Sequence, residues 1–161
     1  MEPDVKYMPK QQLLSLDEYI KIVEIAMSLG ITKLRITGGE PTLYPKLLEL
    51  ITAVSAMGIV DLALTTNGST LNRTMAEQWK NAGLHRVTIS LDTLRPSRKD
   101  AITRSHTTLK DVIAAIDTVR DVGLTPVKVN AVILRGVNDD EVSDFAQFAK
   151  DHEIDMRLIE F

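Results

Sequence analysis

The chain has 161 residues, of which 44% are hydrophobic and 25% charged, a composition typical of one globular domain with a sizeable core. The net charge of −3 argues against a protein that binds nucleic acid or a membrane surface. No apolar run approaches the ~20 residues of a membrane span. The chain contains no cysteine, which excludes disulfides and thiolate metal ligands within it. Residues 1–10 have no apolar centre and are not rich in arginine, so we expect neither a signal peptide nor a transit peptide there.

Helical and strand patterns alternate along the chain. Ser15 and Glu18 form a capping-box pattern, which predicts a helix that ends at Gly30. Further helices are expected from Pro45 to Gly58, at 72–82, within 96–103, from Leu109 to Gly123 and from Val142 to Phe148, with strands at 33–37, 60–65, 86–91, 127–134 and 156–159. This order predicts an α/β fold with a parallel sheet and right-handed crossovers. Two architectures fit it, an open doubly wound sheet and an arc of a barrel.

The predicted strands have two unlike faces. One face is aliphatic, as at Leu62 and Leu64. The other face carries Arg35, Thr37, Thr65, Asn67, Thr88, Ser90, Asp92, Lys128 and Asn130. A barrel interior is normally filled by bulky aliphatic side chains, so these polar groups would need water or a ligand as hydrogen-bond partners. We therefore expect a partial, open barrel that holds a polar, anionic ligand. A sheet with one solvated face is the alternative.

A glycine turn follows the first predicted strand. Gly38 and Gly39 allow a sharp turn and a close approach of a ligand to the backbone N–H groups. Glu40 precedes Pro41, which favours an extended backbone at Glu40 and gives its carboxylate a defined direction. Parallel α/β folds bind ligands at the carboxyl ends of their strands, so this turn is a candidate site. An ordinary strand-to-helix turn is the alternative.

Five blocks of the sequence resemble the radical S-adenosylmethionine (SAM) family. They are RITGGEP at 35–41, TTNG at 65–68, ISLDTL at 89–94, PVKVNAVILRGVNDDE at 126–141 and MRLIEF at 156–161. The later blocks look most similar to the GTP 3′,8-cyclases, lyases of molybdenum-cofactor biosynthesis. The resemblance implies a partial (βα) barrel with parallel strands and helices outside. It also implies a [4Fe-4S] cluster that cleaves SAM to a radical, which starts the conversion of GTP to cyclic pyranopterin.

The resemblance further implies ligand contacts, residue by residue. The expected SAM-binding residues are Gly39, Glu40 and Ser90, and the expected GTP-binding residues are Arg35, Thr66 and Lys128. A guanidinium and an ammonium group suit a triphosphate. As alternatives, Arg35 and Lys128 could pair with Asp92 or Glu40, and Thr66 and Ser90 could serve only as strand formers. We assign no catalytic acid or base, because the implied radical chemistry belongs largely to the cofactor.

The chain departs from the family in lacking its cluster cysteines. The family's CxxxCxxC loop and its C-terminal cysteines have no counterpart here, so we expect no metal ligands in the chain. We interpret 1–161 as an incomplete radical SAM core domain, without the first strand and the C-terminal region, that is inactive by itself. Exposed sheet edges would favour a homo-oligomer or a complementing chain. The expected compartment is the cytoplasm, or the mitochondrial matrix in a eukaryote.

Three other functional interpretations fit the sequence less well. The chain could come from another radical SAM enzyme, such as one that modifies peptides. It could be a non-catalytic remnant that still binds a nucleotide or a partner. It could also be an open-sheet nucleotide-binding protein, although it has neither a GxGxxG pattern nor a P-loop.

Overall fold

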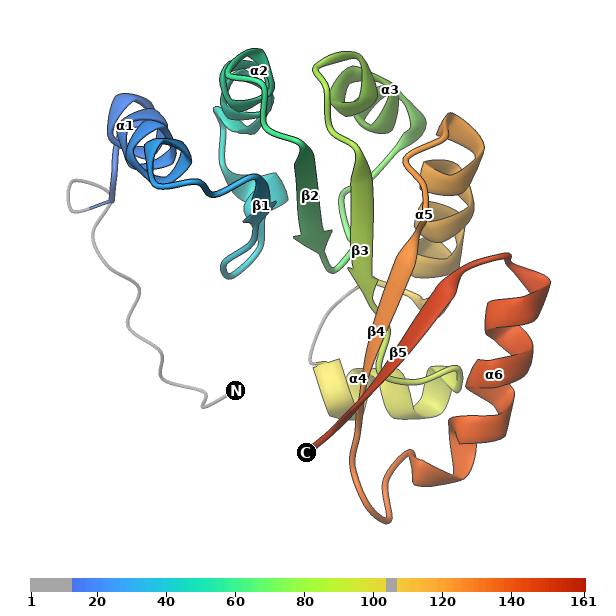
Figure 1. The fold of residues 1–161 in the computed structure, drawn as a ribbon. Helices are drawn as coiled ribbons and strands as arrows, with labels where there is room; N and C mark the ends of the chain where they lie inside the picture. The colour runs from blue at the N-terminus through green and yellow to red at the C-terminus, as the bar shows by residue number, and fades with distance from the viewer. Residues whose placement is uncertain (1–12, 104–106) are drawn as a thin grey trace.

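The computed structural model describes residues 13–103 and 107–161. The segment 1–10, for which we expect no targeting signal, lies outside the described residues. One parallel sheet has its five strands in sequential order, β1-β2-β3-β4-β5 (Figure 1). The strands are β1 (Lys33–Ile36), β2 (Asp61–Thr66), β3 (Arg86–Ser90), β4 (Lys128–Ile133) and β5 (Asp155–Glu160). The sequence therefore predicted every described strand, with bounds that differ by one residue at most at either end.

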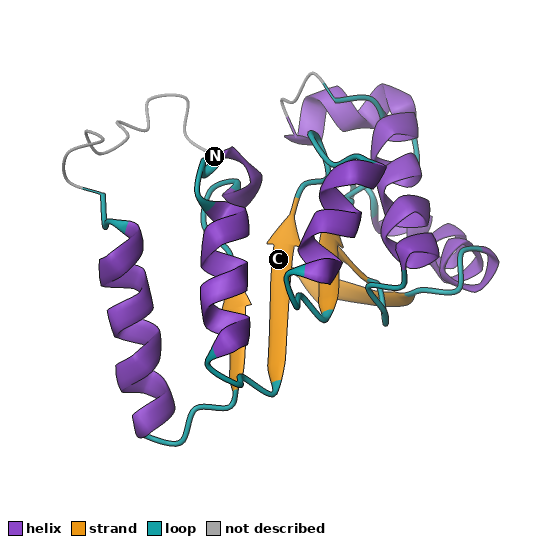
Figure 2. Ribbon diagram, turned by 90° about the horizontal axis from the view of Figure 1, so that it is seen from above, coloured by secondary structure: helices purple, strands orange, loops and turns teal. Residues whose placement is uncertain are grey.

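The connecting helices follow the order that the sequence predicts. They are α1 (Leu16–Ser28), α2 (Leu47–Ala56), α3 (Arg73–Asn81), α4 (Pro96–Thr103), α5 (Leu109–Val122) and α6 (Val142–Asp151), with short 3-10 helices η2 (Pro41–Leu43) and η3 (Asp139–Glu141). Figure 1 shows α1, α2, α3 and α5 in a row along one side of the strands, and Figure 2 shows the molecule from above. In the described part of the chain, no helix combines the length and the apolar character that crossing a membrane requires.

The strand order decides between the two expected architectures. A doubly wound sheet reverses its strand order and so has helices on both faces. A strictly sequential order with right-handed crossovers places successive helices on the same face. The sheet is therefore an arc of an open (βα) barrel, as expected, and its second face is left to the polar side chains.

Local capping explains where the helices begin, with one departure from prediction. At α1, the Ser15 hydroxyl accepts the Glu18 N–H and the Glu18 carboxylate accepts the Ser15 N–H, so the predicted capping box is confirmed. The prediction that Pro45 opens the second helix is wrong. The helix begins at Leu47, and it is Pro41 that opens a short helix, η2, because the Glu40 carboxylate caps the Thr42 N–H.

The core lies between the sheet and the helices. The helix-facing side chains of the central strands, among them Leu64, Ile89 and Val129, have no exposed surface. From the helices, Trp79 is 3% exposed and Ile116 is fully buried. Each such aliphatic side chain contributes about 1.5–3 kcal/mol when it leaves water, so this layer holds the strands in register.

Candidate functional site

Polar side chains meet on the second face of the sheet, as expected. The strand register aligns Thr65, Thr88 and Lys128 across β2, β3 and β4. From β1, Arg35 reaches over them, and its Nη1 donates to Thr65 Oγ1 at 3.2 Å and to Thr88 Oγ1 at 3.3 Å. Both bonds use one nitrogen of a guanidinium that carries five N–H donors. Arg35 is therefore held in place across three strands while it stays exposed on this face.

Ser90, the last residue of β3, lies beside Asn130 of β4 on the same face. Ser90 is exposed. The Oδ1 atom of Asn130 is buried and has no hydrogen-bond partner among the described residues. Buried polar atoms are nearly always satisfied, so this amide indicates a place where a water or a ligand completes the polar face.

The structure does not show the expected alternative pairing of the two cations. Among the described residues, the carboxylate nearest to Lys128 Nζ is that of Asp155, at 3.9 Å. Asp92 instead accepts the Val132 N–H at 2.8 Å, which joins the end of β3 to β4. Lys128, with a side chain 16% exposed, is thus loosely paired at the edge of the polar face.

This face also carries cationic side chains that were not predicted from the sequence to lie there. Register places Lys33, Arg86 and Arg157 on it. Strand alternation from Arg35 and Thr88 would have found the first two, whereas Arg157 follows only from the register between β4 and β5. Arg86 is neutralised, because its Nε donates to Asp61 at 2.9 Å, a hydrogen bond that lowers the pKa of the Asp61 carboxyl. Lys33 and Arg157 are exposed, so the face carries more positive charge than predicted.

The Glu40 carboxylate joins the loop after β1 to the loop after β2. Its Oε1 accepts the Thr42 N–H at 3.0 Å and the hydroxyls of Thr42 and Thr66, each at 2.7 Å. Its Oε2 accepts the Asn67 N–H at 2.8 Å. The backbone of Glu40 is extended, as the following proline predicts. Next to it, Gly39 is exposed, and a Cβ added there would meet no described atom within 4 Å.

Thr66 lies on a different face from the other residues expected to bind GTP. It pairs in register with Ile89, on the helix-facing side, and is 2% exposed. Its hydroxyl donates to Glu40 and accepts the Gly68 N–H at 3.1 Å. Arg35 and Lys128 occupy the polar face, so the structure brings those two together and leaves Thr66 apart from them. Its role as a GTP contact stays a prediction.

A second carboxylate cluster joins the loops after β3 and β4. Glu141 is fully buried and accepts from the Thr93 hydroxyl at 2.8 and 2.9 Å, from the Leu94 N–H at 2.6 Å and from Arg98 Nη1 at 2.8 Å. Beside it, Asn138 donates to the backbone oxygens of Asp92 and Val132. The ISLDTL and NDDE blocks supply these residues, but the sequence alone indicated no contact between them.

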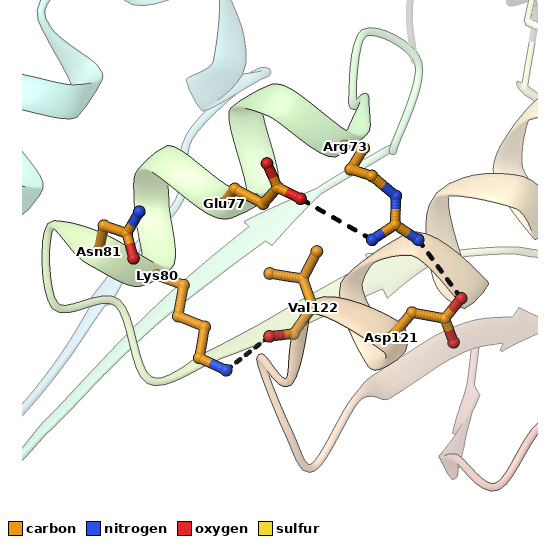
Figure 3. A pocket seen from close by; sticks show the side chains of 6 residues that line it. All are labelled: Arg73, Glu77, Lys80, Asn81, Asp121 and Val122. Carbon is orange, nitrogen blue, oxygen red and sulfur yellow. Dashed lines mark hydrogen bonds and ion pairs between the residues drawn. The ribbon is translucent and has the colours of Figure 1, made fainter.

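A groove between α3 and α5 lies on the helix side of the molecule (Figure 3). Its charges are paired within it, since Arg73 lies 3.8 Å from Glu77 and 3.6 Å from Asp121. The Lys80 ammonium donates to the Val122 carbonyl at 2.6 Å and so caps the C-terminus of α5. We interpret this groove as a structural junction between two helices.

Comparison with known sequences gives the family. A model described as the radical SAM superfamily matches residues 2–149. A protein of Pseudomonas entomophila named GTP 3′,8-cyclase is 45% identical over 161 residues, covering 99% of this chain and 48% of the relative. A GTP 3′,8-cyclase of Thermodesulfovibrio yellowstonii is 46% identical over 155 residues, covering 96% of this chain and 48% of the relative. The chain thus spans about half the length of the curated relatives it matches.

Solved structures share the fold at lower identity. Streptococcus suis SuiB bound to S-adenosylmethionine aligns with a TM-score of 0.80 at 20% identity, covering 93% of this chain and 34% of that chain. Coproporphyrinogen III oxidase (HemN) from Escherichia coli, a radical SAM enzyme, aligns with a TM-score of 0.67 at 11% identity, covering 91% of this chain and 37% of that chain. Fold and family model agree, and the chain belongs to the radical SAM superfamily.

Proposed function

We propose that this chain is a core segment of a GTP 3′,8-cyclase and binds SAM and GTP on the polar face of its sheet. The observation that carries the proposal is the 45% identity, over nearly the whole chain, to relatives that bear this name. The reaction would convert GTP to the cyclic pyranopterin precursor of the molybdenum cofactor. The compartment, cytoplasm or mitochondrial matrix, stays a prediction.

The SAM-binding part of the proposal rests on residues of β3 and β4 and of the loop after β1. Glu40 offers a carboxylate oxygen with room for a further donor, and Gly39 leaves open space beside it. Ser90 offers an exposed hydroxyl, next to the unsatisfied amide of Asn130. An ammonium group and hydroxyl groups, both present in SAM, are suitable partners for these atoms. SAM would supply the organic radical once it is reductively cleaved.

The residues of this chain do not fit an iron–sulfur cluster. Such clusters are held by cysteine thiolates, and the chain has no cysteine. The described residues also contain no group of three or more His, Asp or Glu side chains that could hold a metal ion. We therefore place the cluster ligands outside these 161 residues and assign no cluster-dependent step to any residue here.

The GTP-binding part rests on Arg35 and Lys128. The Arg35 guanidinium is oriented by two hydroxyls rather than by a carboxylate, so its charge is not cancelled by those partners. Lys128 is only loosely paired, at 3.9 Å from Asp155. Cations held in this way on one face suit the oxygens of a triphosphate.

The partner that would complete the site is also part of the proposal. Among the described residues, β1 and β5 are the edge strands of the sheet. Within β5, the residues Leu158 and Ile159 are 43% and 44% exposed. Unpaired edges next to apolar side chains can pair with a further strand, so we propose that a complementing chain or a second copy binds there.

Ligand binding to the purified chain tests the proposal. We expect calorimetry to detect binding of SAM and of GTP, with GTP bound more tightly than ATP. Arg35→Ala should lower the affinity for GTP about 10- to 100-fold, because a charge-assisted contact is lost, and should leave the affinity for SAM unchanged. Glu40→Ala should do the reverse. Arg73→Ala, an exposed arginine in the groove of Figure 3, is the matched control and should alter neither affinity.

Other results would overturn the proposal and indicate one of the alternatives. Affinity for SAM without any for GTP would favour another radical SAM enzyme. Affinity for GTP without any for SAM would favour a nucleotide-binding remnant. A chain that binds neither, while circular dichroism shows it folded, would contradict both ligand assignments.

A further inference from the structure

The two oxygens of the Glu40 carboxylate are unequally occupied. Oε1 accepts three hydrogen bonds, from the Thr42 N–H, the Thr42 hydroxyl and the Thr66 hydroxyl. Oε2 accepts one among the described residues, from the Asn67 N–H. A carboxylate offers about four acceptor positions, two on each oxygen. Oε1 is therefore saturated, and the remaining capacity of this half-buried carboxylate lies on Oε2.

The direction of both hydroxyls follows from the partners around them. An ionised carboxylate can only accept, so each threonine must give its single hydroxyl proton to Oε1. Thr66 Oγ1 is then left to accept, and it receives the Gly68 N–H at 3.1 Å. In the same way, Thr42 Oγ1 receives the Thr70 hydroxyl at 2.8 Å. Both donors are thus themselves oriented, and neither can turn to another acceptor without losing a bond.

Thr66 differs from Thr42 in where it is anchored. Thr42 lies two residues from Glu40 and moves with the same loop. Thr66 ends a different strand, β2, and is 2% exposed. Gly68 holds the following turn against the core, because a Cβ added there would lie 3.3 Å from Ala115 Cβ. Thr66 and the adjacent Asn67 N–H therefore fix the carboxylate relative to the sheet.

We propose that Thr66 is a positioning residue for Glu40, which saturates Oε1 and directs Oε2 toward the ammonium group of SAM. This inference rests on the proposed function and deepens it. It also gives Thr66 a role that fits its place on the helix-facing side of β2, in contrast to the GTP contact that the resemblance implies. The hydroxyl acts through Glu40 and does not itself touch the ligand.

Binding of S-adenosylhomocysteine and its deamino analogue, measured by calorimetry, tests the role of Thr66. The first compound keeps the ammonium group and the second lacks it. Thr66→Val should lower the affinity for S-adenosylhomocysteine roughly tenfold, the cost of one hydrogen bond to a charged group, and should leave the affinity for the deamino analogue unchanged. Thr66→Ser keeps the hydroxyl and should restore affinity to within about twofold. GTP affinity should not change in either variant.

Two further variants complete the design. Thr52→Val is the matched control, since that hydroxyl donates to the Leu48 carbonyl within α2, away from Glu40, and this variant should bind both compounds normally. Thr42→Val removes the other hydroxyl donor to Oε1 and should reproduce the selective loss, which keeps the test valid if Thr66→Val does not fold.

The outcomes separate this inference from the proposed function. If the unsubstituted chain binds neither S-adenosylhomocysteine nor SAM, the proposed function fails and this inference fails with it. If the unsubstituted chain binds and Thr66→Val binds equally well, only the positioning role is overturned. Weaker GTP binding in Thr66→Val, with affinity for S-adenosylhomocysteine retained, would instead make Thr66 a GTP contact.

Discussion

Glu40 and Glu141 occupy similar positions in the fold but differ in burial and in hydrogen-bond partners. Each lies beyond the carboxyl end of a strand, and each accepts a threonine hydroxyl and a backbone N–H from the end of a neighbouring strand or the loop that follows it. Glu141 is fully buried, and both its oxygens are filled, with the Arg98 guanidinium at 2.8 Å. Glu40 is half-buried, forms no ion pair within the described structure, and keeps one oxygen partly open.

This difference distinguishes a carboxylate with a structural role from the carboxylate that we propose binds a ligand. A buried charge whose acceptor positions are all used has nothing left to offer a ligand, and it ties two loops together. A carboxylate that is oriented by neutral donors, and still has an open position at the surface, can accept a cationic group. The loops at the β3–β4 end of the sheet are thus clamped together by Glu141, whereas the β1–β2 end keeps an acceptor position that the described residues do not fill.

The largest effect is expected at the clamped end. Glu141→Gln should lower the free energy of unfolding by about 3–5 kcal/mol, because it removes one partner of a buried pair and leaves Thr93 and the Leu94 N–H facing an amide donor. Urea denaturation followed by circular dichroism measures this. Asp144→Asn, which removes an exposed carboxylate 3.7 Å from Arg95, is the control and should change little. Equal stability of Glu141→Gln and the unsubstituted chain would mean that this end is not clamped.

The turn that supplies the Asn67 N–H should be the next most sensitive. Gly68 and Gly136 share a φ of 74°, but a Cβ at Gly68 would lie 3.3 Å from Ala115 Cβ, whereas one at Gly136 meets no described atom within 4 Å. Gly68→Ala should cost about 2–4 kcal/mol, from left-handed strain plus overpacking. Gly136→Ala should cost about 1 kcal/mol from strain alone. Equal losses in urea denaturation would show that contact with the core does not hold this turn.

A smaller, pH-dependent effect is expected at the surface of the clamp. The hydrogen bond from Arg98, with the charge of Arg95, lowers the pKa of the Asp140 carboxyl from 3.8 to about 2. A carboxyl whose pKa is lower in the folded state stabilises the fold when the pH is above its ordinary pKa. This contribution disappears as the pH falls toward the folded-state pKa. The stability advantage over Asp140→Asn should therefore be full at about pH 6 and shrink below about pH 4. A difference in urea midpoint that stays constant with pH would contradict the pairing.

The smallest effect on stability is expected at Glu40. Glu40→Gln keeps an oxygen that can accept the threonine hydroxyls, and the exposed Asn67 N–H can bond to water instead. The free energy of unfolding should change by about 1 kcal/mol or less. The same substitution at Glu141 should cost several times more, so the pair of variants tests the comparison directly. A large loss of stability in Glu40→Gln would make this carboxylate structural as well.

Periodicity and capping chemistry were sufficient to predict most of the fold. Strand alternation separated the aliphatic face from the face of Arg35 and Lys128, and the Ser15–Glu18 pattern located the first helix. These signals are local, so one sequence contains them. The start of α2 was predicted two residues too early, because Pro45 lies in the turn between η2 and α2 and no side chain caps the helix at Leu47. The cap that does form, from the Glu40 carboxylate to the Thr42 N–H, begins η2 instead.

The partners of the polar groups were decided by the tertiary structure. Sequence order shows that Thr66 ends a strand, but only the register with Ile89 shows that it lies on the helix-facing side, where its hydroxyl reaches Glu40. The cluster around Glu141 joins Thr93 to a residue 48 positions later, a contact that no local pattern contains. Hydrogen bonds between loops depend on how neighbouring strands align. That alignment is set by packing of the whole aliphatic layer, so the sequence could predict the position of a candidate site but not the contacts within it.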